Sequence, residues 1–154
     1  MNEDRAALMA EVDQARIELW DVLDALDSTI EIYPGWNKRD FYAHIAGWEA
    51  MVYEVFLCNA TGNPLKDYHN DFKDNDSVNA AYVAQRKSGL EENIKLECDI
   101  SRYAIIRMMN DIPDEDFKKT IQFPWGKLTA EKFAHDAIDH EREHAADILK
   151  LQQT

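Results

Sequence analysis

The sequence is poor in cysteine and has no long apolar run. Cys58 and Cys98 are its only cysteines, and both fall inside predicted helices, so we interpret them as reduced core residues rather than a disulfide or a ligand pair. No apolar stretch is long enough to cross a bilayer. The amino terminus, Met1-Asn2-Glu3-Asp4, lacks the basic and apolar regions of a signal peptide. These absences predict a soluble, cytoplasmic protein.

Positive charge is also scarce. The chain carries 17 Lys and Arg against 30 Asp and Glu, which gives a formal net charge of −13. Such a chain repels phosphate backbones and anionic lipid surfaces, so neither nucleic acid nor a membrane surface is an expected partner. Hydrophobic residues make up 45% of the 154 residues, enough for a single globular domain spanning residues 1–154 with its own core.

The alternation typical of β-sheets is missing over any useful length. Apolar residues instead recur every three or four positions, as Leu8, Val12, Ala15 and Leu19 do. We therefore predict an all-α fold, a single-domain four-helix bundle with long connections. The predicted helices span 3–26, 38–60, 90–112 and 130–151, with a short helical piece at 77–86 and a break expected near Ser88. The expected N-caps are Ser77, Ser88 (in a capping box with Glu91) and Thr129.

One short motif carries most of the chemical information. Residues 140–144 read His-Glu-Arg-Glu-His, and two His four residues apart stand on one face of a helix, where they can bind one metal ion. Zinc proteases share this motif but take a third ligand downstream. Here Asp147 and Lys150 follow, and only ten residues remain after His144. A third ligand must therefore come from upstream.

The helical pattern supplies a candidate for that ligand. His140 and His144 occupy the inner stripe of the last helix, at positions where other helices carry Leu or Ile. His44 precedes Trp48 and Met51 on the inner face of the second helix. Burying an unpaired polar group costs roughly a few kcal/mol. A shared metal would avoid this cost, because it would satisfy all three imidazoles at once. The alternative is three separate core histidines, each satisfied by a hydrogen bond.

Several other side chains allow more than one interpretation. Glu141, beside His140, either flanks the site as a general base for metal-bound water or faces solvent, and Glu49 is a second candidate base. Asp136 is a candidate to orient a histidine ring. Neither His69, in the polar connection, nor His135 is favoured as a ligand. Three tryptophans either line a pocket or pack in the core: Trp36, Trp48 and Trp125.

These motifs together resemble one known family. The segments Trp36-Asn37-Lys38-Arg39-Asp40, His44-Ile45 and Gly47-Trp48-Glu49 resemble the second helix of DinB-like four-helix bundles. Their last helix is similar to Pro124-Trp125-Gly126, Leu128-Thr129 and Asp139-His140-Glu141 with His144, and the end of their third helix to 112–117. The W-x-x-[KR]-D-x-x-x-H-x-x-x-W pattern most resembles the branch that includes colibactin self-resistance proteins.

The resemblance implies a metal site and a range of activities. It places the ligands at His44, His140 and His144, with Zn or Ni as the ion, and it implies a homodimer. In some members the activity is that of a thiol S-transferase or a small-molecule hydrolase, so a low-molecular-weight thiol is an expected partner. Three functions stay open: a metal-dependent enzyme acting on a small molecule, a protein that binds a small molecule for self-resistance, and a bundle with a purely structural metal.

Overall fold

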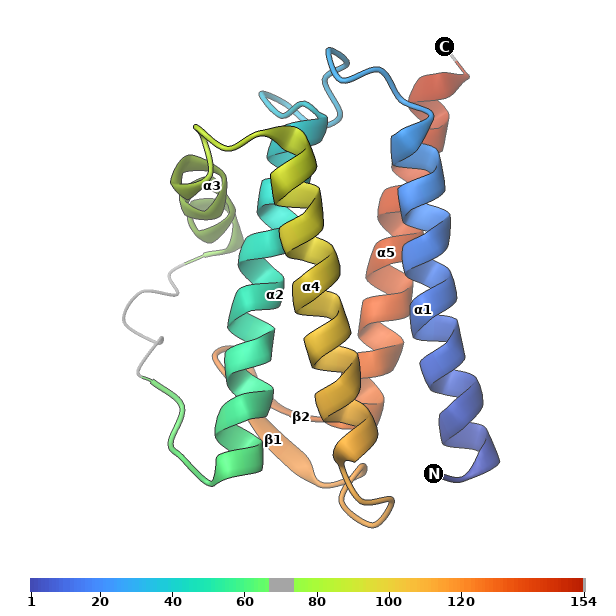
Figure 1. Ribbon diagram of the computed structural model, residues 1–154, viewed down its shortest axis with the longest axis vertical. Helices are drawn as coiled ribbons and strands as arrows, with labels where there is room; N and C mark the ends of the chain where they lie inside the picture. The colour runs from blue at the N-terminus through green and yellow to red at the C-terminus, as the bar shows by residue number, and fades with distance from the viewer. Residues whose placement is uncertain (67–73, 154) are drawn as a thin grey trace.

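The computed structural model describes residues 1–66 and 74–153 of the chain. Four long helices run lengthwise beside one another, and a short helix and a β-hairpin lie at their periphery (Figure 1). The long helices are α1 (Glu3–Asp24), α2 (Lys38–Thr61), α4 (Glu91–Asp111) and α5 (Ala130–Gln152); the short helix is α3 (Asn75–Gln85), and the strands are β1 (Thr120–Phe123) and β2 (Gly126–Thr129).

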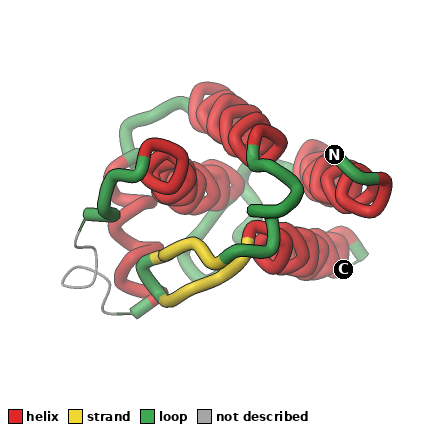
Figure 2. The backbone as a smooth tube through the Cα atoms, turned by 90° about the horizontal axis from the view of Figure 1, so that it is seen from below, coloured by secondary structure: helices red, strands yellow, loops and turns green. Residues whose placement is uncertain are grey.

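The long helices pack as two neighbouring pairs. Helix α2 packs along α4, and α1 packs along α5, so each pair joins helices from different halves of the chain (Figure 1). Helix α3 lies outside the four and packs against α2 (Figure 2). The buried residues form two apolar clusters, one of which includes Val55, Phe56 and Phe123, and the other Leu19 and Phe41. The mostly helical fold expected from the periodicity is therefore present.

A small β-hairpin is added to the all-α fold that the periodicity predicts. Strands β1 and β2 pair antiparallel, with Phe123 opposite Gly126, and the hairpin covers one end of the long helices (Figure 2). Its inward residues Ile121 and Phe123 are buried in the core. Each strand has four residues, too few for a reliable period-two pattern. Gly126 has a φ of 145°, a conformation that favours glycine and helps to make the tight turn possible.

The helix starts were predicted with mixed success. Thr129 caps α5 by accepting a hydrogen bond from the backbone of Lys132, as expected. The expected cap at Ser77 is wrong, because α3 begins earlier and Asp74 accepts from the Ser77 backbone. The capping box at Ser88 is also wrong, since Leu90 is the N-cap of α4 and makes no side-chain cap. The expected break between α3 and α4 is present.

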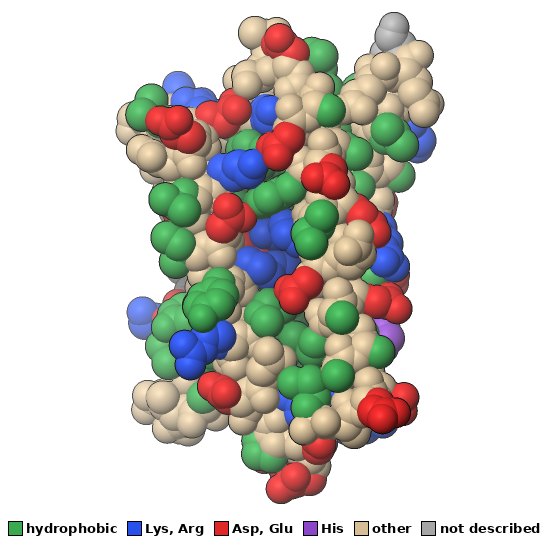
Figure 3. Space-filling model, turned by 45° about the vertical axis from the view of Figure 1, so that its right-hand side comes forward, with side chains coloured by type: hydrophobic (Ala, Val, Ile, Leu, Met, Phe, Trp, Pro, Cys, Tyr) green, Lys and Arg blue, Asp and Glu red, His purple; other side chains and the backbone are tan. Residues whose placement is uncertain are grey.

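Acidic side chains are numerous on one face of the molecule (Figure 3). In the space-filling view they are scattered along the face shown, while a few basic side chains lie in a hollow near its centre, among hydrophobic ones (Figure 3). Among the described residues, no helix is long and apolar enough to span a membrane.

Candidate metal centre

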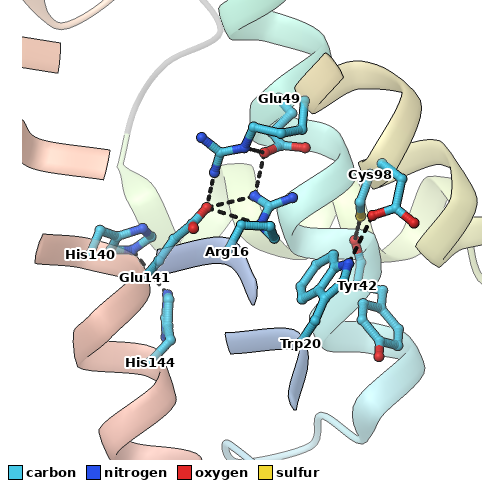
Figure 4. A network of polar contacts seen from close by, with 10 residues as sticks. Arg16, Trp20, Tyr42, Glu49, Cys98, His140, Glu141 and His144 are labelled. Atoms are coloured by element: carbon cyan, nitrogen blue, oxygen red, sulfur yellow. Dashed lines mark hydrogen bonds and ion pairs between the residues drawn. The ribbon is translucent and has the colours of Figure 1, made fainter. Parts of the chain in front are cut away.

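Three histidines from two helices meet at one point. His44 lies on α2, His140 and His144 lie one turn apart on α5, and one ring nitrogen of each lies within 4.8 Å of the others. The Nε2 atoms of His140 and His144 are 3.0 Å apart (Figure 4). Two ligands of a tetrahedral zinc ion, at Zn–N distances of about 2.0–2.1 Å, lie roughly 3.3 Å apart. The spacing of His140 and His144 therefore fits a shared divalent ion, and His44 lies within 4.8 Å of both, near enough to be its third ligand.

The protonation of the rings also suits metal binding. Burial lowers the pKa of His44 to about 4. The pKa of His144 is lowered to about 3, mainly by burial and to a smaller extent by repulsion from the nearby His140 and His44. Burial lowers the pKa of His140 as well. Near pH 7 all three imidazoles are neutral, the form in which a ring nitrogen can donate its lone pair to a metal. His44 is buried, whereas His140 is exposed, so the site is open on the His140 side.

An asparagine on α3 fixes the orientation of His44. The Oδ1 atom of Asn79 accepts hydrogen bonds from His44 Nδ1, at 2.9 Å, and from Trp48 Nε1, at 2.5 Å. Because Nδ1 then carries the proton, Nε2 of His44 keeps its lone pair free for an ion. Helix α3 thus contributes to the site without supplying a ligand.

A tyrosine and an aspartate orient His144 in the same way. Nδ1 of His144 lies 2.6 Å from the Tyr33 hydroxyl, which in turn lies 3.0 Å from Asp147 Oδ2. Burial and the contact with Asp147 raise the pKa of Tyr33 well above its usual value, so the phenol keeps its proton. The hydroxyl therefore donates to Asp147 and accepts from His144, which leaves Nε2 of His144 available for an ion.

Gly47 allows α3 to approach α2 closely enough to place Asn79. A Cβ atom at Gly47 would lie 2.1 Å from the Tyr82 ring, at the root of that side chain, where little movement is available. We expect Gly47→Ala to push α3 outward, although alanine normally stabilises a helix interior by about 1 kcal/mol relative to glycine. Loss of an orienting partner typically weakens metal binding by about 10- to 100-fold, so titration with Zn²⁺ should show a drop of that size.

The matched control for this prediction is Asn79→Ala, which removes the amide without disturbing the helix contact. It should weaken Zn²⁺ binding by a similar factor, and the double variant should lose little more than either single variant, because both changes break the same hydrogen bond. Zn²⁺ binding by Gly47→Ala as tight as that of the unsubstituted protein would contradict the role given to α3.

An aromatic cavity of about 340 Å³ adjoins the histidines. Its walls include Trp48, Trp125 and Phe133, and His44 and His140 belong to its lining. The rings of Trp48 and Trp125 meet edge-on, with their centroids 6.0 Å apart, and Trp125 is 44% exposed. Trp36 lies against the ring of His44, at 5.2 Å between centroids, and lines a neighbouring cavity that His44, His140 and His144 also border. All three tryptophans are thus pocket residues, and the cavity beside Trp48 and Trp125 is of a size that holds small ligands.

A buried layer of four charged residues closes one side of this cavity, with one residue from each long helix. Oε1 of Glu141 contacts Nε of Arg16 at 3.1 Å and Nη2 at 2.6 Å, and it also contacts Arg102 (Figure 4). Oε1 of Glu49 contacts Arg16 at 2.5 Å and Arg102 at 3.0 Å. All four residues line the cavity. The formal charges of this charged layer sum to zero.

The layer changes the interpretation of two candidate bases. The alternative in which Glu141 faces solvent is wrong, because Glu141 is 4% exposed. Glu141 lines the cavity together with His140, and Glu49 does so from α2. Each carboxylate directs one oxygen to the arginines, whereas its Oε2 has no hydrogen-bond partner among the described residues. Their roles as bases stay predictions.

The remaining candidates lie elsewhere. Asp136 pairs with Lys132 and lines the cavity, so it does not orient a histidine. His135 is exposed on α5 and is not part of the histidine group. His69 lies outside the described residues. Sequence reasoning missed Tyr33, Asn79 and the arginines of the charged layer. The arginines had a signal, because Arg16 and Arg102 stand at inward-facing positions of their helices.

The comparisons with known proteins place the fold. No family model and no curated protein matches the sequence. One solved structure is similar, described as the crystal structure of the mycothiol-dependent maleylpyruvate isomerase, with a TM-score of 0.72 and 11% sequence identity. The match covers 93% of this chain and 60% of that one. The likeness shows a shared fold, consistent with the DinB-like fold that the sequence motifs resemble.

Proposed function

We infer that this chain is a divalent-metal enzyme acting on a small molecule, of the hydrolase or thiol S-transferase type. The observation that carries this inference is the grouping of three neutral imidazoles beside an aromatic cavity of about 340 Å³, with the site open at His140. Nitrogen ligands suit several transition metals, and we propose Zn or Ni because the resemblance to DinB-like bundles implies one of these two. When bound, the ion would supply Lewis acidity and activate a water or a thiol.

The residues of the chain divide the remaining tasks. His44, His140 and His144 would hold the ion, and Asn79 and Tyr33 keep two of these rings in the required tautomer. The aromatic walls of the cavity would bind the apolar body of a substrate and exclude water from it. In a hydrolytic reaction, Glu141 is the proposed base, because it lines the cavity together with His140.

The structural neighbour favours a thiol as the second reactant. That protein is described as mycothiol-dependent, and this chain spans 60% of its length. We therefore propose, by analogy, that this chain also uses a thiol. A low-molecular-weight thiol could reach the open side of the site at His140. Because a thiolate is itself a strong nucleophile, transfer to an electrophile would not need a protein base at the moment of attack.

A second candidate function is binding without turnover. Trp48 and Trp125 give the cavity the aromatic walls that a self-resistance protein of the proposed colibactin-related branch would need to sequester a toxic small molecule. A purely structural metal is disfavoured by the exposure of His140, since structural ions are normally enclosed by four protein ligands.

We also propose a homodimer, supported by an apolar stripe on α4. Leu96, Ile100 and Tyr103 lie on one face of that helix and are 55%, 62% and 66% exposed. Exposed apolar surface of this kind marks contact sites in soluble proteins. Sedimentation equilibrium should give twice the chain mass of 17.9 kDa, and a species of single-chain mass at micromolar concentration would refute the dimer.

Cobalt substitution tests whether the site is open to a thiol. Co²⁺ takes the same ligands as Zn²⁺, and its visible spectrum reports their number and type. Adding a small thiol to the Co²⁺-loaded protein should produce a new near-ultraviolet thiolate-to-metal band, which S-methyl cysteine should not produce. A spectrum that changes with azide but not with thiol would favour hydrolysis. A spectrum unchanged by either would mean a closed, structural site and would overturn the enzyme proposal.

A further inference from the structure

The cavity has two chemically different sides. One is aromatic and aliphatic, with Trp48, Phe133 and Ile105 among its residues. The other is the charged layer of Arg16, Glu49, Arg102 and Glu141. A ligand that fills this space must therefore place an apolar body against one side and a polar group against the other.

The charged layer has hydrogen-bonding capacity that its own members do not use. Among the described residues, Nη1 of Arg16 has no acceptor, and Oε2 of Glu49 and Oε2 of Glu141 have no donor. These three residues are only 7%, 8% and 4% exposed. Unpaired polar atoms at such depth are costly, so a ligand that pairs with them gains more than it would at the surface. Nε of Arg102 also makes no hydrogen bond within the described residues, although it lies 3.0 Å from Glu49 Oε1. The unused set is therefore two donors and two acceptors.

The charge balance of the layer determines which polar group fits. Two guanidinium groups and two carboxylates face one another, so the layer has no net formal charge to offset a further buried charge. A carboxylate would meet Arg16 but would also meet two carboxylate oxygens that need donors. An ammonium group would satisfy those oxygens and leave the guanidinium unpaired. Burying either ion without a counter-charge is unfavourable.

We propose that the charged layer is a recognition subsite for an uncharged group that both donates and accepts hydrogen bonds, such as a primary carboxamide, on a flat apolar molecule. The carbonyl oxygen of such a group accepts from Arg16, and its NH₂ group donates to Glu49 and Glu141. This proposal rests on the proposed function, because it assumes that the substrate binds in the same cavity. The proposal adds the chemical class of that substrate.

A matched set of three probes tests the subsite. The probes 2-naphthamide, 2-naphthoate and 2-naphthylmethylamine share one apolar body and differ in charge. Binding to the whole chain is followed at pH 7 by tryptophan fluorescence and calorimetry, with and without Zn²⁺, because an ion would itself attract the carboxylate. We expect the carboxamide to bind at least about tenfold more tightly than either charged probe. The methyl ester of naphthoate, which lacks the donors, should bind less tightly than the carboxamide.

One variant should shift the preference from the carboxamide towards the carboxylate. Glu49→Gln keeps the size of the side chain but gives the layer a net positive charge, so the ratio of carboxylate to carboxamide affinity should rise by at least about tenfold. Circular dichroism confirms that the variant is folded. If it is not folded, the comparison of the three probes on the unsubstituted protein decides alone.

Each other outcome overturns the assignment. Preference for the carboxylate would mean an anion site, preference for the amine a cation site, and equal or absent binding a layer satisfied by water. The same measurements distinguish failure of the proposed metal site from failure of the proposed subsite. A protein that binds no Zn²⁺ but still prefers the carboxamide retains the subsite, whereas a Zn²⁺ protein that binds all probes equally retains only the metal site.

Discussion

Arg102→Met should lower the free energy of unfolding by about 3 kcal/mol or more. Arg102 contributes a guanidinium from α4 to both carboxylates of the charged layer, and its side chain is 11% exposed. Methionine fills similar space but leaves Glu49 and Glu141 with Arg16 as their one shared counter-charge in the layer. Removing one partner of a buried ion pair is far more costly than replacing all partners together. Urea denaturation followed by circular dichroism gives the value.

Two further variants separate the charge effect from the loss of side-chain packing. Arg107→Met makes the same change at an exposed position of α4 and should alter stability by no more than about 0.5 kcal/mol. Adding Glu49→Gln to Arg102→Met restores a neutral layer, so the double variant should lose clearly less than the sum of the single losses. A change below about 1 kcal/mol in Arg102→Met would show that the four charges do not hold the helices together.

Glu141→Gln should reduce turnover about a hundredfold or more on any substrate that the metal-loaded protein hydrolyses. The carboxylate lines the cavity together with His140, one of the three proposed metal ligands, so it lies on the side of the cavity nearest the proposed ion. Glutamine keeps the shape of the side chain and removes its basicity. The zinc content should stay unchanged, because Glu141 is not one of the three ligands.

The matched comparison for this prediction is Glu49→Gln, which removes the same charge from the same layer on α2. Loss of turnover in Glu141→Gln alone identifies Glu141 as the base, and loss in Glu49→Gln alone transfers that role to Glu49. Equal losses would mean that the charge balance of the layer matters rather than either base. Full activity in both variants would remove a protein base and point to a thiol cosubstrate.

The histidine group was predictable because it depends on helical geometry within two segments. His140 and His144 are four residues apart, and His44 shares a face with Trp48 and Met51, so the period of the helix turns all three towards one point. The partners that orient them were not predictable. Asn79 reaches His44 only because α3 packs on α2 at Gly47, a tertiary contact that local spacing does not encode.

The charged layer has a signal in the sequence, in the positions of its two arginines. Arg16 lies four residues after Val12 and three before Leu19, and Arg102 lies four after Cys98 and three before Ile105. Both are therefore inward-facing positions, where an unpaired charge is costly. Each demands a buried partner of opposite sign. The position of Glu141 beside His140 does not by itself distinguish a side chain that flanks the site from one that faces solvent; the two inward-facing arginines do.

The short β-hairpin and the helix starts mark the limit of local patterns. Four-residue strands give too little alternation to detect, and the hairpin forms where Ile121 and Phe123 can be buried against the ends of the long helices. Leu90, the N-cap of α4, makes no side-chain cap, so packing of the helix rather than its local sequence fixes that boundary. Tertiary burial decided both features.

The most direct test of the metal centre is the metal content of four proteins purified without chelator and then titrated with Zn²⁺ or Ni²⁺. The unsubstituted protein and His135→Ala should each bind one ion per chain, because His135 is exposed on α5 and lies outside the histidine group. His44→Ala and His144→Ala should each bind at least about tenfold more weakly, since each removes one of three ligands. No binding by the unsubstituted protein, or unchanged binding by His144→Ala, would contradict the site.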